Sequence, residues 1–184
     1  LPILRQHNIK QYLLEVIQTN TSAFDLYKKK GFEVKRELDC YISSKSDLKF
    51  DEKKLNKQFQ LQAIKEPDWD LFKSFWDFHP SWQNSIDSIN RKLEHFTILG
   101  IFENGQTIGY GIEENHTGDI PQMAIGHSYR KKGFATTLIK NLLDYSGSDQ
   151  VRIINADSDY GPFKHFTSSI NLNPELGQYE MVLE

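Results

Sequence analysis

The sequence predicts an α/β domain with a mixed sheet, and three observations lead to this class. Runs rich in β-branched and aromatic residues alternate with segments whose apolar residues recur at helical spacing. The dipeptide Asn104-Gly105 stands between two of these runs and is a strong signal for a hairpin. From Phe59 onward the expected elements follow the order β-α-α-β-β-β-α-β-α-β, which is typical of helices packed on a sheet.

The first part of the chain is expected to form a strand, a helix and further strands. Residues 12–17 have the composition of a strand. Residues 19–22 offer side chains that cap a helix, and Gly31 is expected to end it, because glycine accommodates the left-handed backbone that often follows a helix. Residues 32–42 then predict one or two strands.

This order repeats the last part of the chain. Residues 1–6 resemble the end of a helix already under way, so the segment reads helix-β-α-β. A shift of about 140 residues places Tyr27-Gly31-Phe32 over Thr167-Asn171-Leu172, although few identities survive. We therefore expect residues 1–45 to be the C-terminal part of a first domain, residues 46–58 to be a polar linker and residues 59–184 to be a complete second domain.

Within residues 59–184 the predicted elements follow from apolar periodicity and from turn residues. They are a strand over 59–64, helical stretches over 69–78 and 83–93, hairpin strands over 96–102 and 107–113, a strand over 120–125, a helix over 133–143, a strand over 151–156, a helix over 162–170 and a final strand over 179–183. Pro80 separates the two helical stretches, because proline removes a backbone donor and breaks a helix.

Composition excludes several classes of protein. Hydrophobic residues make up 38% of the 184 residues, enough for a core, and the net charge of -3 gives no reason to expect nucleic-acid binding. No apolar run reaches the roughly 20 residues of a membrane span, and no secretory signal opens the sequence. Cys40 is the single cysteine, which excludes an internal disulfide and a multi-cysteine zinc site. We expect a cytoplasmic protein that binds neither a metal nor a membrane.

The segment YRKKGFA, residues 129–135, is the strongest candidate for a binding site. It follows a predicted strand and opens a predicted helix, whose first turn has free backbone N–H groups that bind anions. Gly133 lets the backbone approach a ligand closely. Arg130, Lys131 and Lys132 add positive charge suited to a pyrophosphate or a 3′-phosphate. A solvated basic turn capped by a glycine is the alternative interpretation.

In this context Arg130, Gly133 and Ala135 resemble a known motif. They fill the pattern (Q/R)-x-x-G-x-(G/A) with which the GNAT acetyltransferase superfamily binds acetyl-CoA, and the elements around them follow the family's order. The resemblance covers residues 59–184. A partial second match covers residues 1–42, where Asn20, Ala23, Tyr27, Gly31 and Phe32 resemble the family's N-x-x-A-x-x-x-Y-x-x-x-G-F tail.

The resemblance implies a GNAT fold, in which helices flank a mixed and mainly antiparallel sheet, with a partial second GNAT unit at the N-terminus. It implies transfer of the acetyl group of acetyl-CoA to a primary amine of a small molecule or peptide. Backbone N–H groups before the motif would hold the pantetheine and polarise the thioester. The expected cofactor-binding residues are Met123, Ala124, Ile125, Arg130, Lys131, Lys132, Gly133, Phe134, Ala135 and Thr136.

For the proton transfers the resemblance is less complete. Many members use a tyrosine on the last helix to protonate the leaving thiolate, but Thr167 stands at that position here. Tyr160 is the substitute that we consider, and Tyr27 holds the equivalent position in the first copy. An amine acceptor also needs a base, because amines are mostly protonated at neutral pH.

Glu113 and Glu114 are the candidates for this base, since they end the second strand of the hairpin. A solvated strand end is the alternative for both. Asp157 and Asp159 are similar candidates with the same alternative, and His127 in the turn before the motif is a weaker one.

Two other functions remain open at this point. A degenerate GNAT domain would bind acyl-CoA without turnover, which the missing tyrosine favours. A nucleotide- or phosphate-binding module would share only the strand-glycine-helix arrangement, but neither G-x-x-x-x-G-K-[ST] nor G-x-G-x-x-G occurs. An incomplete first domain would also expose strand edges, and a homodimer is one way to cover them.

Overall fold

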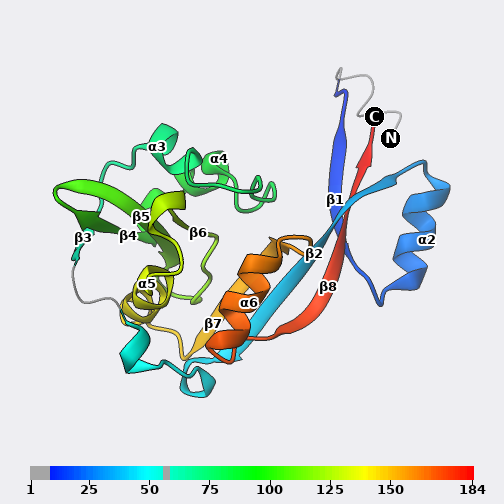
Figure 1. The fold of residues 1–184 in the computed structure, drawn as a ribbon. Helices are drawn as coiled ribbons and strands as arrows, with labels where there is room; N and C mark the ends of the chain where they lie inside the picture. The colour runs from blue at the N-terminus through cyan, green and yellow to red at the C-terminus, as the bar shows by residue number, and fades with distance from the viewer. Residues whose placement is uncertain (1–8, 56–58) are drawn as a thin grey trace.

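The strands of the protein form two sheets (Figure 1). The computed structural model describes residues 9–55 and 59–184, so the helix end expected at residues 1–6 lies outside the described part. The first sheet consists of β3 (Gln60–Ala63), β4 (Phe96–Glu103), β5 (Gln106–Glu114) and β6 (Gln122–Ile125), which run antiparallel in that order.

The hairpin between β4 and β5 confirms the turn predicted from the sequence. Asn104 and Gly105 have φ angles of 51° and 77°. Two successive positive φ angles are what the two-residue hairpin turn of type I′ requires. Pairing continues to Glu103 and Gln106, so each strand reaches the turn itself.

Two short helices, α3 (Trp69–Lys73) and α4 (Ile86–Asn90), pack on one face of this sheet. The predicted helical stretches, 69–78 and 83–93, were too long. The Ser85 side chain accepts a hydrogen bond from the Ser88 N–H and so starts α4 later than expected. Residues 74–85 between the helices form turns instead, and several of them border the cavity described below.

Helix α5 (Phe134–Leu142) covers the opposite face of the sheet, where the sequence predicts it. The helix lies close because the β5 strand offers glycine at the contact. A Cβ atom added at Gly111 would stand 2.4 Å from Leu142 Cδ1, a distance that real Cβ contacts do not show. No described helix is long and apolar enough to cross a membrane.

The second sheet joins the two ends of the chain in the order β1-β8-β2-β7, with all neighbours antiparallel. Its strands are β1 (Tyr12–Ile17), β8 (Pro174–Leu183), β2 (Glu33–Ser44) and β7 (Gln150–Asp157). Two helices connect them, α2 (Thr21–Lys29) and α6 (Gly161–Ser169). The final strand therefore starts earlier than the predicted range of 179–183.

Two β-α-β units build this sheet by exchanging strands. Strand β1 pairs with β8 and strand β7 pairs with β2, so neither outer strand pairs with the later strand of its own unit. The later strands β2 and β8 pair with each other at the centre. In both units a positive φ follows the helix, 90° at Gly31 and 62° at Asn171. These two positions are 140 residues apart, and each follows the helix of its own β-α-β unit.

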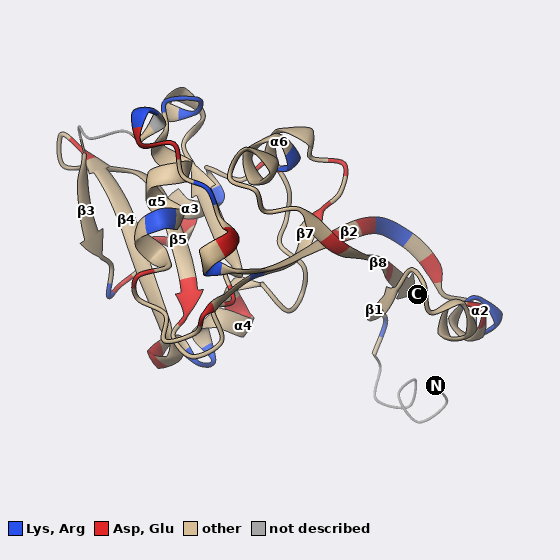
Figure 2. Ribbon diagram, turned by 90° about the horizontal axis from the view of Figure 1, so that it is seen from below, with Lys and Arg blue, Asp and Glu red and all other residues tan. Residues whose placement is uncertain are grey.

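Acidic and basic residues follow one another along β2 (Figure 2). Among them Arg36 joins three strands of the exchanged sheet. Its guanidinium donates to the Glu180 carboxylate on β8 at 2.9 and 3.0 Å and lies 3.6 Å from the Asp157 carboxylate on β7. Glu180 is only 5% exposed, so without Arg36 it would be a buried uncompensated charge.

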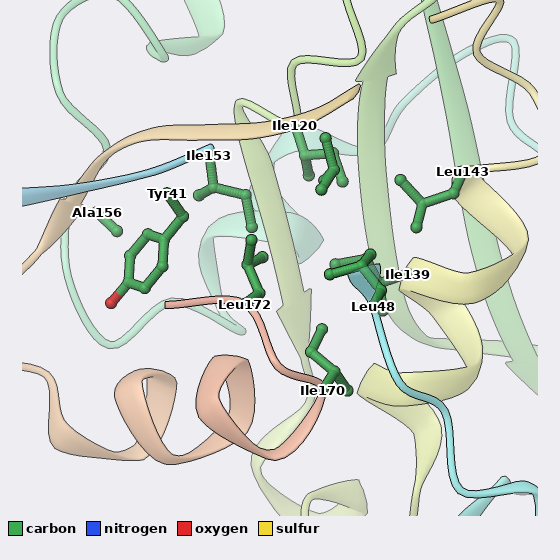
Figure 3. Packing of buried hydrophobic residues seen from close by; sticks show 10 residues of the cluster. Tyr41, Leu48, Ile120, Ile139, Leu143, Ile153, Ala156, Ile170 and Leu172 are labelled. Carbon is green, nitrogen blue, oxygen red and sulfur yellow. The ribbon is translucent and has the colours of Figure 1, made fainter. Parts of the chain in front are cut away.

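A shared core connects the two sheets (Figure 3). Ile139 from α5 and Leu143, which caps its C-terminal end, lie in one cluster with Ile153 from β7. Leu48 joins it from the stretch predicted as a linker, which also forms the 3₁₀ turns η1 (Lys45–Asp47) and η2 (Glu52–Lys54). At least part of residues 46–58 is therefore packed against the core, while residues 56–58 lie outside the described part.

Gly118 is expected to be essential where the two sheets meet. It has a φ of 76°, and a Cβ atom there would lie 2.1 Å from the Gln150 carbonyl oxygen. We expect Gly118→Ala to lower the free energy of unfolding by about 3 kcal/mol or more, because backbone strain and a clash with backbone add. Urea unfolding curves measure this loss.

Gly105→Ala is the matched control for this substitution. Gly105 has a φ of 77°, but nothing lies within 4 Å of an added Cβ atom. Gly105→Ala should therefore lower the free energy of unfolding only by the backbone strain, about 1–2 kcal/mol. Equal losses in the two variants would show that the close approach at Gly118 is not tight.

Candidate functional site

The candidate site lies where the two sheets part. The Ile120 N–H donates to the Arg152 carbonyl at 2.7 Å, and the Arg152 N–H donates to the Gly118 carbonyl at 2.9 Å. Beyond this parallel bridge β6 pairs with β5 and β7 pairs with β2, so the two strands present unpaired edges to each other. A cavity of about 500 Å³ opens there, lined by residues of both strands.

The edge of β6 offers backbone donors to this cavity. The Gly126 N–H donates to the Ile108 carbonyl at 2.8 Å, which identifies Ile125 and Met123 as members of the non-hydrogen-bonded pairs of the β5–β6 ladder. Their N–H and C=O groups therefore point away from β5, toward the cavity. Among the described residues neither N–H has a hydrogen-bond partner.

The loop after β6 presents further backbone donors. The 3₁₀ turn η4 (His127–Tyr129) leads into Lys131 with a φ of 58° and Gly133 with a φ of 84°. No side chain caps α5, and the Thr137 N–H donates to the Gly133 carbonyl at 3.0 Å. The N–H groups of residues 134–136 therefore point out of the helix end, where the helix dipole favours an anion.

The walls of the cavity are apolar and largely aromatic. The aromatic lining residues are Phe75, Trp76, Phe78, Tyr110, Tyr129, Phe134, Tyr160, Phe163 and Phe166. Hydrogen bonds in such surroundings are stronger than in water, and unpaired polar groups cost more. Within the described ranges no group of three or more histidine, cysteine, aspartate or glutamate side chains could hold a metal ion.

Arg130 is held by the protein on every side of its guanidinium. Nε donates to the Ile125 carbonyl at 2.9 Å, and the terminal nitrogens donate to the Phe75 carbonyl, to the Asp77 carboxylate at 2.8 Å and to the Tyr160 hydroxyl at 3.1 Å. The side chain thus connects the end of β6 with the turns after α3 and with the start of α6.

Tyr160 is a protonated hydroxyl at neutral pH. Burial, and then the hydrogen bond to the Asp77 carboxylate, raise the pKa of Tyr160 to about 12, against the opposing charge of Arg130. Partial burial acts to raise the pKa of Asp77, but the hydrogen bonds from Arg130 and Tyr160 prevail and lower it. Tyr160 can therefore donate a proton or a hydrogen bond, whereas Asp77 stays ionised.

The profile of the acetyltransferase (GNAT) family matches residues 61–161. This match covers more than half of the chain and includes β6, the loop after it and Tyr160. The chain belongs to the GNAT family. Comparison with curated proteins gives no match.

Solved GNAT structures share the fold. The GCN5-related N-acetyltransferase from Kribbella flavida has 10% identity and a TM-score of 0.66, and the alignment covers 92% of this chain and 67% of that one. The corresponding protein from Sphaerobacter thermophilus has 15% identity and a TM-score of 0.63, with 99% and 64% covered. A tandem GNAT protein from the clavulanic acid biosynthesis pathway has 12% identity and a TM-score of 0.68, with 100% and 66% covered. The chain spans about two thirds of the length of these structures.

Most of the residues predicted to bind the cofactor line the GNAT cavity. They are Met123, Ala124, Ile125, Arg130, Lys131, Gly133, Phe134, Ala135 and Thr136. Lys132 does not line it, and its Nζ atom lies 5.4 Å from the centroid of the Tyr129 ring. Arg130 was expected to offer its charge to a phosphate, but its donors face oxygen atoms of the protein instead.

The glutamates predicted as bases lie outside the cavity. Glu114 accepts hydrogen bonds from the His116 and Thr117 N–H groups at 3.0 and 2.6 Å, so it caps a turn. Glu113 is fully buried, with Lys45 and Ser146 near its carboxylate. Neither carboxylate faces the cavity.

Five other residues considered for proton transfer do not line the cavity either. Tyr27 packs against Phe32 in the second sheet, with 5.7 Å between the ring centroids. Thr167 is buried and donates to the Lys164 carbonyl at 3.1 Å. Asp157 pairs with Arg36, while Asp159 follows it in the turn before α6. His127 is exposed at 3.8 Å from Asp77. Of the proton-transfer candidates only Tyr160 lines the cavity.

Asp77 and Asn84 line the cavity without any preceding signal in the sequence. Both belong to residues 74–85, which the apolar spacing predicts as mostly helical. Their roles depend on where turns place them, and turn geometry between two short helices leaves no periodic pattern to detect.

Glu113 is expected to make the stability of the protein depend on pH. Burial raises its pKa from 4.5 to about 7, against the attraction of Lys45. The folded state therefore binds more protons than the unfolded state between these values, so stability falls as pH rises from about 4.5 to 7. Glu113→Gln should remove this part of the decrease in stability, because glutamine does not titrate.

Urea unfolding at pH 5 and pH 8 tests this expectation. Between pH 5 and pH 8 the free energy of unfolding of Glu113→Gln should rise by about 1–3 kcal/mol relative to that of wild type, since each pKa unit corresponds to about 1.4 kcal/mol. Glu103→Gln, at the half-buried end of β4 beside the hairpin turn, is the control and should follow the wild-type profile. A Glu113→Gln profile parallel to wild type would contradict the assignment.

Proposed function

We propose that this GNAT domain transfers the acetyl group of acetyl-CoA to the primary amine of a small molecule or peptide. The observation that carries the proposal is the row of unpartnered backbone donors along one cavity. It runs from the N–H groups of Met123 and Ile125 to the N–H groups at the start of α5. An elongated ligand with carbonyl groups at one end and phosphates at the other complements this row.

The residues present fit acetyl-CoA. The first turn of α5 and the cationic side chain of Lys131 would hold the pyrophosphate. The pantetheine arm would lie along the free edge of β6, since an extended chain with amide groups can add to an unpaired strand edge. When bound, acetyl-CoA supplies an activated acyl group as a thioester.

In this proposal Met123 and Tyr160 have separate roles in the transfer of the acetyl group. The Met123 N–H would donate to the thioester oxygen as negative charge develops on it. The amine nitrogen bonds to the acyl carbon while the carbon–sulfur bond breaks. The nitrogen then loses a proton to solvent, and the leaving thiolate takes one up. We assign the role of proton donor to Tyr160, because its hydroxyl is protonated at neutral pH and lines the cavity.

A second function has one observation in its favour. The position of the family's last-helix tyrosine is Thr167, and its hydroxyl donates to a backbone carbonyl outside the cavity. A domain that binds acyl-CoA without turnover would have no need of that tyrosine. Binding without thiol release in any amine assay would favour this regulatory or structural role.

We also propose that residues 1–45 belong to another GNAT unit, of which they form the C-terminal part, while residues 59–184 form a complete unit. Two β-α-β units of matching order and the positive φ after each helix support this proposal. The likeness to a tandem GNAT protein along the whole chain supports it as well.

Acetyl-CoA is expected to bind more tightly than ATP, because the cavity continues from the phosphate end along the β6 edge. Calorimetric titration with CoA, acetyl-CoA and ATP measures the difference. Gly133→Val should weaken acetyl-CoA binding by more than about 100-fold, since a β-branched residue disfavours the positive φ of the cradle.

Gly105→Val in the hairpin turn is the control, because it imposes the same strain far from the cavity. The affinity of this variant for acetyl-CoA should match that of the wild-type protein. Tighter binding of ATP than of acetyl-CoA would reject the proposed function, and unchanged affinity in Gly133→Val would place the phosphates elsewhere.

Asp77 and Tyr160 are expected to affect turnover and not affinity. Tyr160→Phe should lower thiol release with a panel of primary amines by about 100-fold or more, the usual effect of losing a general acid. Asp77→Asn should lower it less, because this substitution only removes a side chain that positions the Tyr160 hydroxyl and Arg130. Acetyl-CoA affinity should change little, because the Arg130 side chain is assigned to protein oxygens and not to phosphate.

Asp70→Asn, on the exposed side of α3, is the matched control. It should leave thiol release unchanged. A loss of acetyl-CoA affinity in Asp77→Asn as large as that in Gly133→Val would show that Asp77 acts on the phosphate end instead.

A further inference from the structure

A chain of buried hydrogen bonds crosses the wall of the cavity. The Trp76 indole N–H donates to the Tyr110 hydroxyl at 2.6 Å, the Tyr110 hydroxyl donates to the Gln122 side-chain oxygen at 2.9 Å, and the Gln122 amide donates to the Asn84 backbone carbonyl at 2.6 Å. Tyr110 and Gln122 are 0% and 5% exposed. The chain therefore fixes β5 and β6 relative to the turns over residues 74–85.

Asn84 extends this connection to the other sheet. Its side-chain amide donates to the Ile154 carbonyl of β7 at 2.7 Å. One residue thus contacts β6 through its backbone and β7 through its side chain, on either side of the gap in which the cavity lies.

The Ile154 carbonyl needs this donor because β6, the strand across the gap, does not pair with β7 at this point. The Arg152 carbonyl accepts from the Ile120 N–H, and Ile154, two residues later, faces the same side. In a continuous parallel ladder the Gln122 N–H would be its partner. The β5–β6 register instead directs the Gln122 N–H to β5, so the Asn84 amide replaces the missing backbone donor.

The contact also lies at the end of the edge that β7 presents to β6. Asn155 follows with a φ of 62°, and the register between β7 and β2 shifts there. Such a bulge changes the direction of the backbone groups that follow it. Ile154 lies within this shift, between the paired residues Ile153 and Ala156, where the regular pairing of β7 with β2 is interrupted.

Arg130 donates to a cavity-facing carbonyl on the β6 side, that of Ile125, at 2.9 Å. Asn84 and Arg130 together occupy one carbonyl on each side of the gap. The N–H groups of Met123 and Ile125 stay open, so the gap presents donors to whatever enters it.

We propose that Asn84 is a positioning residue for acetyl transfer. It holds β7 at a fixed distance from β6, so that the thioester carbonyl lies within hydrogen-bonding reach of the Met123 N–H. The proposal rests on the function proposed above. Without the Asn84 amide the gap is wider, the carbonyl is less polarised, and the phosphate end of the site is unaffected.

Infrared difference spectroscopy of acetyl-CoA labelled with ¹³C at the acetyl carbonyl tests the proposal without knowledge of the acceptor. In the wild-type protein the C=O stretch should move to lower frequency on binding, because donors polarise the bond. Asn84→Ala and Asn84→Asp lack the amide donor, and most of this frequency shift should be lost. Their acetyl-CoA affinity should fall by less than about tenfold, or about 1.4 kcal/mol.

Two further variants control for folding and for the chemistry of the donor. Asn84→His can place a ring N–H near the Ile154 carbonyl and should recover part of the frequency shift. Asn90→Ala, at the exposed end of α4, should retain all of it. Asn84→Asp and Asn84→His keep the side chain polar and of similar reach, so the test does not depend on the alanine variant being folded.

The outcomes separate the two proposals. A wild-type shift that survives in Asn84→Ala and Asn84→Asp overturns the role of Asn84, as does an affinity loss above about 100-fold, which would make Asn84 a binding residue. Acetyl-CoA that binds the wild type without any shift also overturns it but leaves cofactor binding intact. Failure of the wild type to bind acetyl-CoA at all rejects the proposed function, and the positioning role with it.

Discussion

The site depends on one interruption of backbone pairing, the parting of β6 from β7 beyond the Ile120–Arg152 bridge. Two strand edges inside a protein normally pair, because unpaired peptide groups in apolar surroundings are costly. Here side chains satisfy the carbonyls of Ile125 and Ile154, and N–H groups are left for a ligand. The Ile125 and Ile154 carbonyls are occupied while the Met123 and Ile125 N–H groups are open, so the cavity favours ligands that accept hydrogen bonds.

The same principle changes the meaning of the basic motif. Three cationic side chains in a row suggest that charge attracts the phosphates. Yet the Arg130 guanidinium is directed to Asp77, Tyr160 and two carbonyls, so it braces the segments around the cavity. The positive φ angles at Lys131 and Gly133 and the uncapped start of α5 make the backbone the main source of donors.

Features with a strong local cause could be predicted from the sequence. The Asn104-Gly105 turn, the helix after Gly133 and the strand before the motif all have such a cause and lie where expected. Long-range choices could not be predicted. Strand β2 has the same alternation whether it pairs with β1 or β7, so the exchange leaves no trace in composition. Glu113 looks like a solvated strand end in the sequence, because nothing local reveals the tertiary packing that buries it.

The exchanged strands also tie the candidate site to the ends of the chain during folding. Tyr12 lies opposite Leu183 in β1 and β8, so this sheet closes only after segments at opposite ends of the sequence meet. Such non-local pairing slows folding, and the two β-α-β units become one cooperative unit for opening. Since β7 is held by β2, which is held by β8, fraying at the outer strand β1 weakens the wall of a cavity several strands away. Amide hydrogen exchange in β7 would then report on events at the opposite edge of the sheet.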